Sequence, residues 1–361
     1  MPNQVTTTDM RPVRLSINRQ VIEVPAGTTI LEAARRLGIR IPQMCGKAGV
    51  VANATCRVCL VEIEGDPQLR TSCNTEVQPG MRVATNSARV RSARRMNVAL
   101  MLAGHAGDCA TCDRSVFCEL RSLAHEVGLK STYFPPPELP PSPPDRSHPS
   151  LHREPDKCIR CGRCVKVCRE VQGVEAIGSM FRGARIQVQA ASPVGLAETA
   201  CVGCGQCILA CPVGALHEPY DYERIWDILH DPKKVVLVQI SPSTQVTVGE
   251  EFGMSTGSAM GGRVVAAWRR LGARAVFSTT AAADLTTLEE AEELMTRVRA
   301  AEQLPLFSSC SPGWVKYAEH FVPEVLPLLS TCKSPQQMFG VLAKSWLADS
   351  MGVNPRDVVV V

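Results

Sequence analysis

Apolar and polar residues alternate along the beginning of the chain with the period of two that is typical of β-strands. The alternating apolar residues before and after the Asn18-Arg19 turn are Val13, Leu15, Ile17, Val21, Ile22 and Val24. They predict a β-hairpin. Helical spacing over 29–37 ends at Gly38, and two further strands are expected at 59–64 and 81–85. Together these elements predict a small ferredoxin-like β-grasp domain over residues 1–88.

The middle of the chain changes its pattern twice. Helical spacing over 90–105 leads into a cysteine-bearing segment, 89–131, which we expect to be a second small domain. Eight prolines then fall between Tyr133 and Pro149, and they predict an extended linker over 132–150. Two similar cysteine groups follow as an internal repeat, which predicts a ferredoxin-type domain over 151–220.

Beyond residue 220 short apolar runs alternate with amphipathic stretches. The expected strands are 235–240, 275–277, 305–309 and 358–361, and the expected helices are 261–271, 285–300 and 335–351. This alternation predicts a parallel α/β domain over 221–361, in which ligands lie at the carboxyl ends of the strands. The fold class expected for the whole chain is α+β.

Composition excludes several classes of protein. The 361 residues carry a net charge of +4 and only 4% aromatics, which gives no support to nucleic-acid binding. No uncharged apolar run is long enough to span a membrane, and residues 1–14 lack the apolar core of a secretory signal. We therefore expect a cytoplasmic protein. In a reducing compartment, 17 cysteines in tight CxxC groups indicate metal binding rather than disulfides.

The first cysteine group lies in the predicted β-grasp domain. Its members are Cys45, Cys56, Cys59 and Cys73. Two thiolates three positions apart, with one more on either side, can enclose a [2Fe–2S] core. A structural zinc site is the alternative, because zinc also accepts four thiolates.

The second group combines one histidine with three cysteines: His105, Cys109, Cys112 and Cys118. Such a set can hold a [4Fe–4S] cluster in which imidazole replaces one thiolate. A neutral ligand should raise the reduction potential of that cluster. The alternative is a surface histidine beside a three-cysteine zinc site.

The third and fourth groups both have the spacing CxxCxxCxxxC of two-cluster bacterial ferredoxins. They are Cys158, Cys161, Cys164 and Cys168, then Cys201, Cys204, Cys207 and Cys211. In that motif the fourth cysteine of each run binds the other [4Fe–4S] cluster, so Cys168 and Cys211 are expected to cross over. These groups use fifteen of the 17 cysteines and leave Cys310 and Cys332. The expected cofactors are one [2Fe–2S] and three [4Fe–4S] clusters.

A set of arginines lies at the start of the predicted helix over 90–105: Arg89, Arg91, Arg94 and Arg95. We interpret it as a solvated helix face. The alternative is a basic surface that attracts an acidic ferredoxin.

This order of clusters resembles the large iron–sulfur subunit of complex I, the diaphorase-side subunit of bidirectional hydrogenases and the N-terminal part of [FeFe]-hydrogenases. Four later segments resemble the catalytic domain of [FeFe]-hydrogenases: GEEFGM (249–254), ADLTTLEEAEEL (283–294), FSSCSPGWVKYAEHF (307–321) and LSTCKSPQQMFG (329–340). The resemblance implies H₂ chemistry at an H-cluster, with electrons from ferredoxin or a flavin/NAD(H)-binding diaphorase subunit.

The resemblance also implies roles for single residues. The proton relay of the family corresponds to Cys310, Glu290, Ser330 and Glu293, and the pocket around its diiron unit corresponds to Pro242, Ser243 and Pro335. Glu290 and Glu293 are neighbours on a predicted helix. The expected apolar face of that helix is Leu285, Leu288, Ala291, Met295 and Val298. Taken alone, this pattern is typical of a solvated acidic face.

Two departures from the family pattern bear on catalysis. Ser311 replaces a cysteine that binds the cubane of the H-cluster in relatives, and the second and third cysteine signatures of the family would lie beyond Val361. We therefore expect this chain to be the electron-transfer part of an [FeFe]-hydrogenase that is incomplete as a catalyst. The alternatives are a non-catalytic relay subunit and a sensor or assembly protein derived from the same domain.

Overall fold

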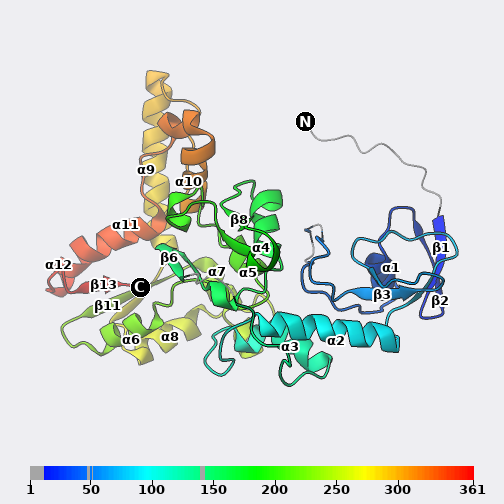
Figure 1. Ribbon diagram of the computed structural model, residues 1–361. Helices are drawn as coiled ribbons and strands as arrows, with labels where there is room; N and C mark the ends of the chain where they lie inside the picture. The colour runs from blue at the N-terminus through cyan, green and yellow to red at the C-terminus, as the bar shows by residue number, and fades with distance from the viewer. Residues whose placement is uncertain (1–11, 47–48, 51, 139–142) are drawn as a thin grey trace. The chain divides into compact units, whose positions relative to one another are not determined.

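The computed structural model describes residues 12–46, 49–50, 52–138 and 143–361. The chain divides into two compact units, one up to Pro219 and one from Tyr220 onward (Figure 1). Among the described residues the first unit has three sheets and two hydrophobic cores, and the second unit has one sheet and two cores.

The first unit opens with a five-stranded mixed sheet in the order β2-β1-β5-β3-β4. Its strands are β1 (Pro12–Ile17), β2 (Gln20–Pro25), β3 (Leu60–Ile63), β4 (Arg70–Thr71) and β5 (Arg82–Ala84). The predicted hairpin is confirmed, because β1 and β2 pair antiparallel around Asn18 and Arg19, both with positive φ (49° and 71°). Two such residues give the turn whose twist matches that of the strands.

Helix α1 (Ile30–Arg36) packs on this sheet. The Thr29 side chain accepts a hydrogen bond from the backbone N–H of Glu32 and so caps the helix. Ile30, Ala33 and Ala34 are fully buried in one core with Ile17 and Val24 of the hairpin. The loop that follows α1 carries Cys45, so the packing of α1 determines where that loop begins.

Helix α2 (Ala88–Ala103) begins at the capping residue Ser87. The interpretation of its arginines as one solvated face is wrong for Arg94, which is only 7% exposed. The Arg94 guanidinium donates to the backbone carbonyls of Val58, Leu60 and Thr85, at 3.0–3.3 Å. A single charged group therefore donates to three carbonyls from two separate segments of the chain, and hydrogen bonds of this kind are among the strong ones.

The rest of the first unit consists of short elements around a second core. They are α3 (Glu119–Glu126), β6 (Asp145–His148), β7 (Leu151–Arg153), α4 (Arg163–Lys166), β8 (Ile177–Met180), β9 (Gln187–Ala190), α5 (Gln206–Ala210) and β10 (Leu216–His217). β6, β7 and β10 form a sheet in the order β10-β7-β6, and β8 pairs with β9. The predicted linker over 132–150 is therefore wrong for 145–148, which pair antiparallel with β7. Residues 139–142 of that linker lie outside the described residues.

The second unit is built on a three-stranded parallel sheet, in the order β12-β11-β13. The strands are β11 (Val235–Ile240), β12 (Ala275–Ser278) and β13 (Val358–Val360), which confirms the predicted parallel sheet. The helices are α6 (Tyr222–His230), α7 (Pro242–Thr247), α8 (Gly261–Leu271), α9 (Thr279–Ala300), α10 (Pro312–Phe321), α11 (Pro335–Leu342) and α12 (Ala348–Met351).

Alternate residues of β11 enter two separate cores. Val236 and Val238 pack with Val264 of α8, whereas Leu237 packs with Ala282 of α9 and Phe339 of α11. Because both faces of β11 are covered, its sequence is mostly apolar, as in parallel sheets generally. Short 3₁₀ turns (115–117, 155–157, 183–185, 196–198, 250–252, 323–328) and π-helical turns (167–171, 343–347) complete the two units.

Two predictions for the second unit are wrong. Residues 305–309 do not form a strand, because only Phe307 makes an isolated parallel bridge, with Leu329. The expected apolar face of 285–300 is exposed, with Leu288 at 67% and Val298 at 51%. Helix α9 begins at Thr279 and instead buries Ala282, Thr286 and Arg297. The buried side of α9 therefore includes the polar residues Thr286 and Arg297, which form hydrogen bonds there, instead of the apolar stripe that periodicity predicts.

Replacing Arg94 by methionine tests its part in this architecture. The substitution removes the guanidinium donor from the carbonyls of Val58, Leu60 and Thr85, so we expect local stability to fall by about 2–3 kcal/mol, a roughly hundredfold loss of protection. Hydrogen exchange of the β3 amides measures this loss. The neighbouring exposed Arg95→Met variant is the control and should change protection little. Equal protection in the two variants would contradict the role of Arg94.

Candidate functional site

The first cysteine group converges beside β3. The backbone N–H of Cys45 donates to the Cys56 sulfur at 3.4 Å, and Cys59 lies just before β3 and next to Cys73. A hydrogen bond between the side chains of each pair lowers the pKa of Cys45 to about 5 and that of Cys59 to about 7. The same bonds raise the pKa of Cys56 and Cys73. Four clustered thiols, two of them readily ionised, suit the thiolate ligands of a [2Fe–2S] cluster.

A second set of four thiols surrounds one small, mainly apolar cavity. This cavity set consists of Cys158, Cys161, Cys164 and Cys211. The remaining walls of the cavity include Ile177, Val188 and Pro212. Burial raises the pKa of Cys161 to about 12 and that of Cys164 well above its usual range. Thiols buried together in this way are stabilised as thiolates only by a compensating positive centre such as cluster iron.

In the third set Cys168 lies next to the cysteines of the second half of the repeat. Burial, and then the neighbouring Cys201, Cys204 and Cys168, raise the pKa of Cys207 to about 12. Cys211 therefore lies with the first run of cysteines and Cys168 with the second. This is the crossed arrangement expected from the CxxCxxCxxxC spacing.

The fourth set lies between α2 and α3. Cys118 is buried at the start of α3, and its pKa is raised by burial and by the neighbouring Cys109 and Cys112. His105 follows the end of α2, and its Nδ1 is 2.8 Å from the Lys157 carbonyl oxygen. That carbonyl accepts a proton only from Nδ1–H, so the Nε2 atom of the neutral ring keeps its lone pair. Burial lowers the pKa of His105, which favours the neutral form that binds metal.

Hydrogen bonds join the loops of three of these sets. The Asn53 side chain, in the first loop, donates to the Cys161 carbonyl at 3.1 Å. Arg163, between Cys161 and Cys164, donates two hydrogen bonds of 2.7 Å to the carboxylate of Glu119, the residue after Cys118. The cavity set is therefore in contact with both neighbouring sets.

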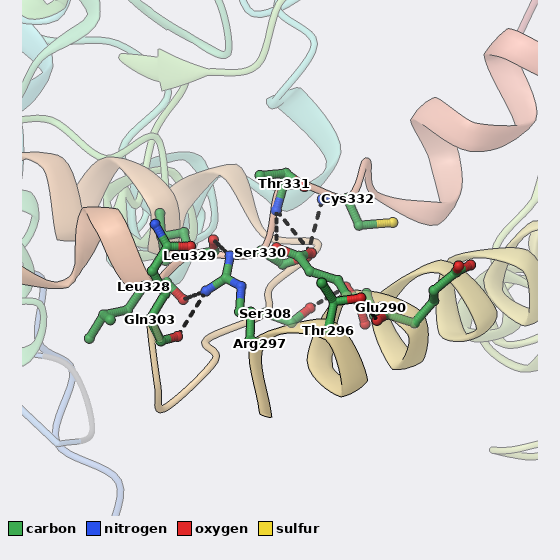
Figure 2. A network of polar contacts seen from close by, with 12 residues as sticks. Glu290, Thr296, Arg297, Gln303, Ser308, Leu328, Leu329, Ser330, Thr331 and Cys332 are labelled. Atoms are coloured by element: carbon green, nitrogen blue, oxygen red, sulfur yellow. Dashed lines mark hydrogen bonds and ion pairs between the residues drawn. The ribbon is translucent and has the colours of Figure 1, made fainter. Parts of the chain in front are cut away.

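A polar network in the second unit joins α9 to the segments before and after α10 (Figure 2). The carboxylate of Glu293 accepts from the Ser330 hydroxyl at 2.6 Å, from the Thr331 N–H at 3.2 Å and from Arg297. Burial acts to raise the pKa of Glu293, but these donors outweigh it and lower the pKa overall. The Ser308 hydroxyl bonds to Glu290, so the structure holds both predicted acidic residues in this network.

Arg297, which the sequence analysis did not select, holds the network in place. Its guanidinium donates to the carbonyls of Gln303, Leu328 and Leu329 at 2.7–3.2 Å. Its i,i+4 spacing from Glu293 was the available signal, but that spacing is equally typical of an exposed helical ion pair. Only the folded loop shows that Arg297 is buried and Glu293 partly buried.

Cys310 is exposed and lies in a cavity of about 420 Å³ that Ser330 and Cys332 also line. Ser311 has a structural role, because its side chain accepts from the Trp314 N–H and caps α10. The start of α11, at Ser334 and Gln336, forms another wall of this cavity.

The remaining predicted residues lie near the carboxyl end of β11. Pro242 and Ser243 are the first residues of α7, which follows β11, and Pro335 is the first residue of α11. The Gln239 side chain on β11 donates to the Gln336 carbonyl at 3.2 Å, so the two helix starts lie at the same end of the sheet. This is the end at which parallel α/β sheets bind ligands.

Two kinds of feature are absent from the described parts of the chain. No helix there has the length and apolar character that crossing a bilayer requires. Within the same residues no three His, Cys, Asp or Glu side chains are arranged to hold a single metal ion.

Four family models match the chain in sequence. Residues 10–88 match a 2Fe-2S iron-sulfur cluster binding domain, 94–132 the NADH-ubiquinone oxidoreductase-G iron-sulfur binding region, and 153–217 a 4Fe-4S dicluster domain. Residues 234–361 match the C-terminal domain of the iron only hydrogenase large subunit. The chain is thus a mixed α/β protein with [2Fe–2S] and [4Fe–4S] binding domains.

Curated relatives agree with these matches. The chain is 42% identical to the NADP-reducing hydrogenase subunit HndD of Solidesulfovibrio fructosivorans over 98% of its own length, and 34% identical to iron hydrogenase 1 of Clostridium pasteurianum over 96%. It spans 62% and 60% of these relatives. The mitochondrial NADH-ubiquinone oxidoreductase 78 kDa subunit of Neurospora crassa is 32% identical over 62% of this chain and 30% of its own length.

A solved structure resembles part of the chain. The crystal structure of a NAD⁺-reducing [NiFe]-hydrogenase in the H₂-reduced state aligns with a TM-score of 0.53 and 33% identity, covering 57% of this chain and 87% of that one. The likeness therefore extends to a hydrogenase of a different metal type.

Glu293→Gln tests the polar network by its pH dependence. Because its pKa is lowered in the folded chain, the Glu293 carboxylate stabilises the network above the ordinary glutamate pKa of about 4.3, and this contribution is lost as pH falls through the lowered pKa. We expect the protection factor of the Thr331 amide to fall over that acid range in the wild type.

In the Glu293→Gln variant the protection factor of the Thr331 amide should be lower at neutral pH and should not fall further as the pH is lowered. The control is Glu292→Gln on the exposed side of α9, which should behave as the wild type. If the protection of the Thr331 amide still falls at acid pH in the Glu293→Gln variant, the Glu293 carboxylate is not the cause of that fall.

Proposed function

Because the chain belongs to the family of iron-only hydrogenase large subunits, we propose that its first unit is an electron-transfer chain of four iron–sulfur clusters. The observation that carries the proposal is the grouping of thiols into separate sets whose loops are hydrogen-bonded to one another. Clusters bound by loops in such contact would be neighbours, as electron transfer between them requires.

We assign one cluster to each set. Cys45, Cys56, Cys59 and Cys73 would hold a [2Fe–2S] cluster, and three sets would hold [4Fe–4S] clusters: His105 with Cys109, Cys112 and Cys118; Cys158 with Cys161, Cys164 and Cys211; Cys201 with Cys204, Cys207 and Cys168. These clusters supply reversible one-electron chemistry when bound. The chain supplies the buried thiolates, the neutral imidazole and the surroundings that tune each potential.

The contacts suggest a branched route. The cavity set touches the first loop through Asn53 and the His105 set through Arg163 and Lys157. Electrons that enter at either of those sets would therefore meet at the cavity set and continue to the Cys201 set. A flavin- and NAD(P)H-binding partner subunit fits this role, because the relatives include a subunit of a NADP-reducing hydrogenase. A ferredoxin is a second candidate donor.

For the second unit we propose the proton path of an [FeFe]-hydrogenase, 2H⁺ + 2e⁻ ⇌ H₂. The H-cluster of the family supplies the site of H₂ formation when it is bound. In this chain Cys310 would hand protons to or from the cavity that it shares with Ser330, and Glu293 would exchange them with Ser330 through the 2.6 Å hydrogen bond. Glu290 would extend the path through Ser308. Pro242, Ser243 and Pro335 would surround the diiron unit.

The second candidate function is an electron-relay subunit without H₂ chemistry. Ser311 favours it, because this residue caps α10 where relatives place a cluster-binding cysteine, and a serine hydroxyl is a poor ligand for iron. The NADH-ubiquinone oxidoreductase relative and the [NiFe]-hydrogenase likeness also favour it, because neither name describes an iron-only hydrogenase.

We predict that the anaerobically reconstituted chain binds roughly 14 irons, the sum for one [2Fe–2S] and three [4Fe–4S] clusters. His105→Cys should retain this iron and lower the potential of one [4Fe–4S] cluster, since a charged thiolate replaces a neutral ring. Iron analysis and potentiometric EPR measure both. Stoichiometric zinc in a colourless protein would refute the cluster assignment, and an unchanged titration would remove His105 from the ligands.

Cys310→Ala separates the two candidate functions. In the natural polypeptide with its partner subunits, we expect the variant to reduce viologen with H₂ at least about a hundredfold more slowly, while NAD(P)H-driven viologen reduction changes less than about twofold. Ser309→Ala, beside it in the chain, is the matched control. Wild-type protein that transfers electrons from NAD(P)H but shows no reaction with H₂ would establish the relay function instead.

A further inference from the structure

The two ferredoxin motifs differ in charge at equivalent positions. The first run reads CIRCGRC (158–164) and the second CVGCGQC (201–207). Arg160 therefore corresponds to Gly203, and Arg163 corresponds to Gln206. Both runs turn into a short helix after a glycine with positive φ, Gly162 or Gly205, so the backbones are alike and the charges are not.

Arg160 occupies a backbone conformation that favours glycine. Its φ is 56°, close to the 68° of Gly203 at the equivalent position of the repeat. A side chain with a Cβ atom is strained in this region, and glycine is not. An arginine at this position therefore indicates a use for its side chain.

The Arg160 side chain reaches across to the end of α2. A Cβ atom added at Gly104 would lie 3.7 Å from Arg160 Nη2, so the guanidinium lies beside the residue that precedes His105. The backbone N–H of Arg160 donates to the Cys158 sulfur at 3.4 Å. Arg160, His105 and Cys158 line one cavity, and Arg160 thus connects the His105 set to the cavity set.

Arg153 is a second cation at the same place. It is 8% exposed and lines both the cavity shared with His105 and the cavity that the four thiols surround. Burial lowers the pKa of Arg153, and the negative charges that oppose this effect are those of Cys158, Asp145 and Cys164. Two of these three groups are thiols of the cavity set. A buried cation is costly unless negative groups lie nearby, and a cluster with its thiolates is such a group.

Other arginines near the two sets are paired with carboxylates. Arg163 pairs with Glu119, and Arg169, beside Cys168, lies 3.8 Å from Glu175. Among the described residues Arg153 and Arg160 form no such ion pair, and both line a cavity with Cys158; Asp145 is the carboxylate that acts on Arg153 alongside the thiols.

We propose that Arg153 and Arg160 raise the reduction potential of the cluster held by Cys158, Cys161, Cys164 and Cys211 above that of the cluster held by Cys168, Cys201, Cys204 and Cys207. The inference rests on the proposed function. Reduction adds one negative charge to a cluster, and cations in a medium of low dielectric stabilise the reduced form. When bound, the cluster where the two branches meet would then be reduced more readily than the next cluster.

Arg160→Gly tests this inference without straining the backbone, because glycine is the residue that the repeat has at this position. At the potential where this cluster is half reduced in the wild type, we expect the ratio of reduced to oxidised cluster to fall about tenfold, which is about 59 mV for one electron. Potentiometric EPR of the whole reconstituted chain measures the ratio. Arg160→Lys, which keeps the charge, should restore most of it.

Two further variants exclude an indirect effect. Arg153→Gln should lower the same midpoint. Arg57→Gly relaxes another arginine of positive φ (54°), next to Cys56, and should leave the midpoints of all [4Fe–4S] clusters unchanged. If all clusters are present and neither Arg160→Gly nor Arg153→Gln moves a midpoint, the inference is wrong while the proposed function stands. A wild-type chain that binds no clusters would instead defeat the proposed function.

Discussion

The ion pair between Arg163 and Glu119 holds the cysteine-bearing loops of the first unit in register. Arg163 lies between two cysteines of the cavity set and is 4% exposed, and Glu119 follows Cys118 directly. Burial acts to lower the pKa of Arg163, but the two hydrogen bonds to the Glu119 carboxylate outweigh it and raise the pKa overall. A bidentate pair fixes orientation as well as distance, so it sets the position of one loop against the other. Short loops with little secondary structure need such a constraint, because packing alone specifies them weakly.

Cysteine spacing predicted the sets well, for a physical reason. A thiolate can reach a shared core only if the backbone between ligands is of the right length, so the spacing CxxCxxCxxxC already contains the geometry. The structure places Cys211 with the first run and Cys168 with the second, as the spacing predicts. The proposed ligand role of His105 rests on a single residue and has no comparable spacing to support it.

Periodicity was less informative where polar groups are buried. It assigned Arg94 to solvent, yet this guanidinium bonds to three backbone carbonyls. It assigned an apolar face to α9, yet the buried side of that helix carries Arg297 and Thr286. For both arginines the partners include backbone atoms far away in the sequence, and side-chain patterns contain no information about them. The sequence analysis also missed the strand β6, because prolines argue against strand pairing and here they lie on both sides of the strand.

Charge is distributed differently in the two units, and this matches the particles that each is proposed to carry. The cations that line the thiol cavities of the first unit belong to arginines, whose charge does not vary with pH in the physiological range. A permanent positive charge changes the reduction potential of a nearby group without itself taking up or releasing a proton. In the polar network of the second unit Arg297 is paired with Glu293, and hydroxyl groups connect the carboxylates of Glu290 and Glu293 to the loops around Cys310. Hydroxyls both donate and accept, so they can pass a proton along the network, which a row of arginines cannot do. The first unit thus offers surroundings suited to electron transfer and the second unit a network suited to proton transfer, as the two proposed roles require.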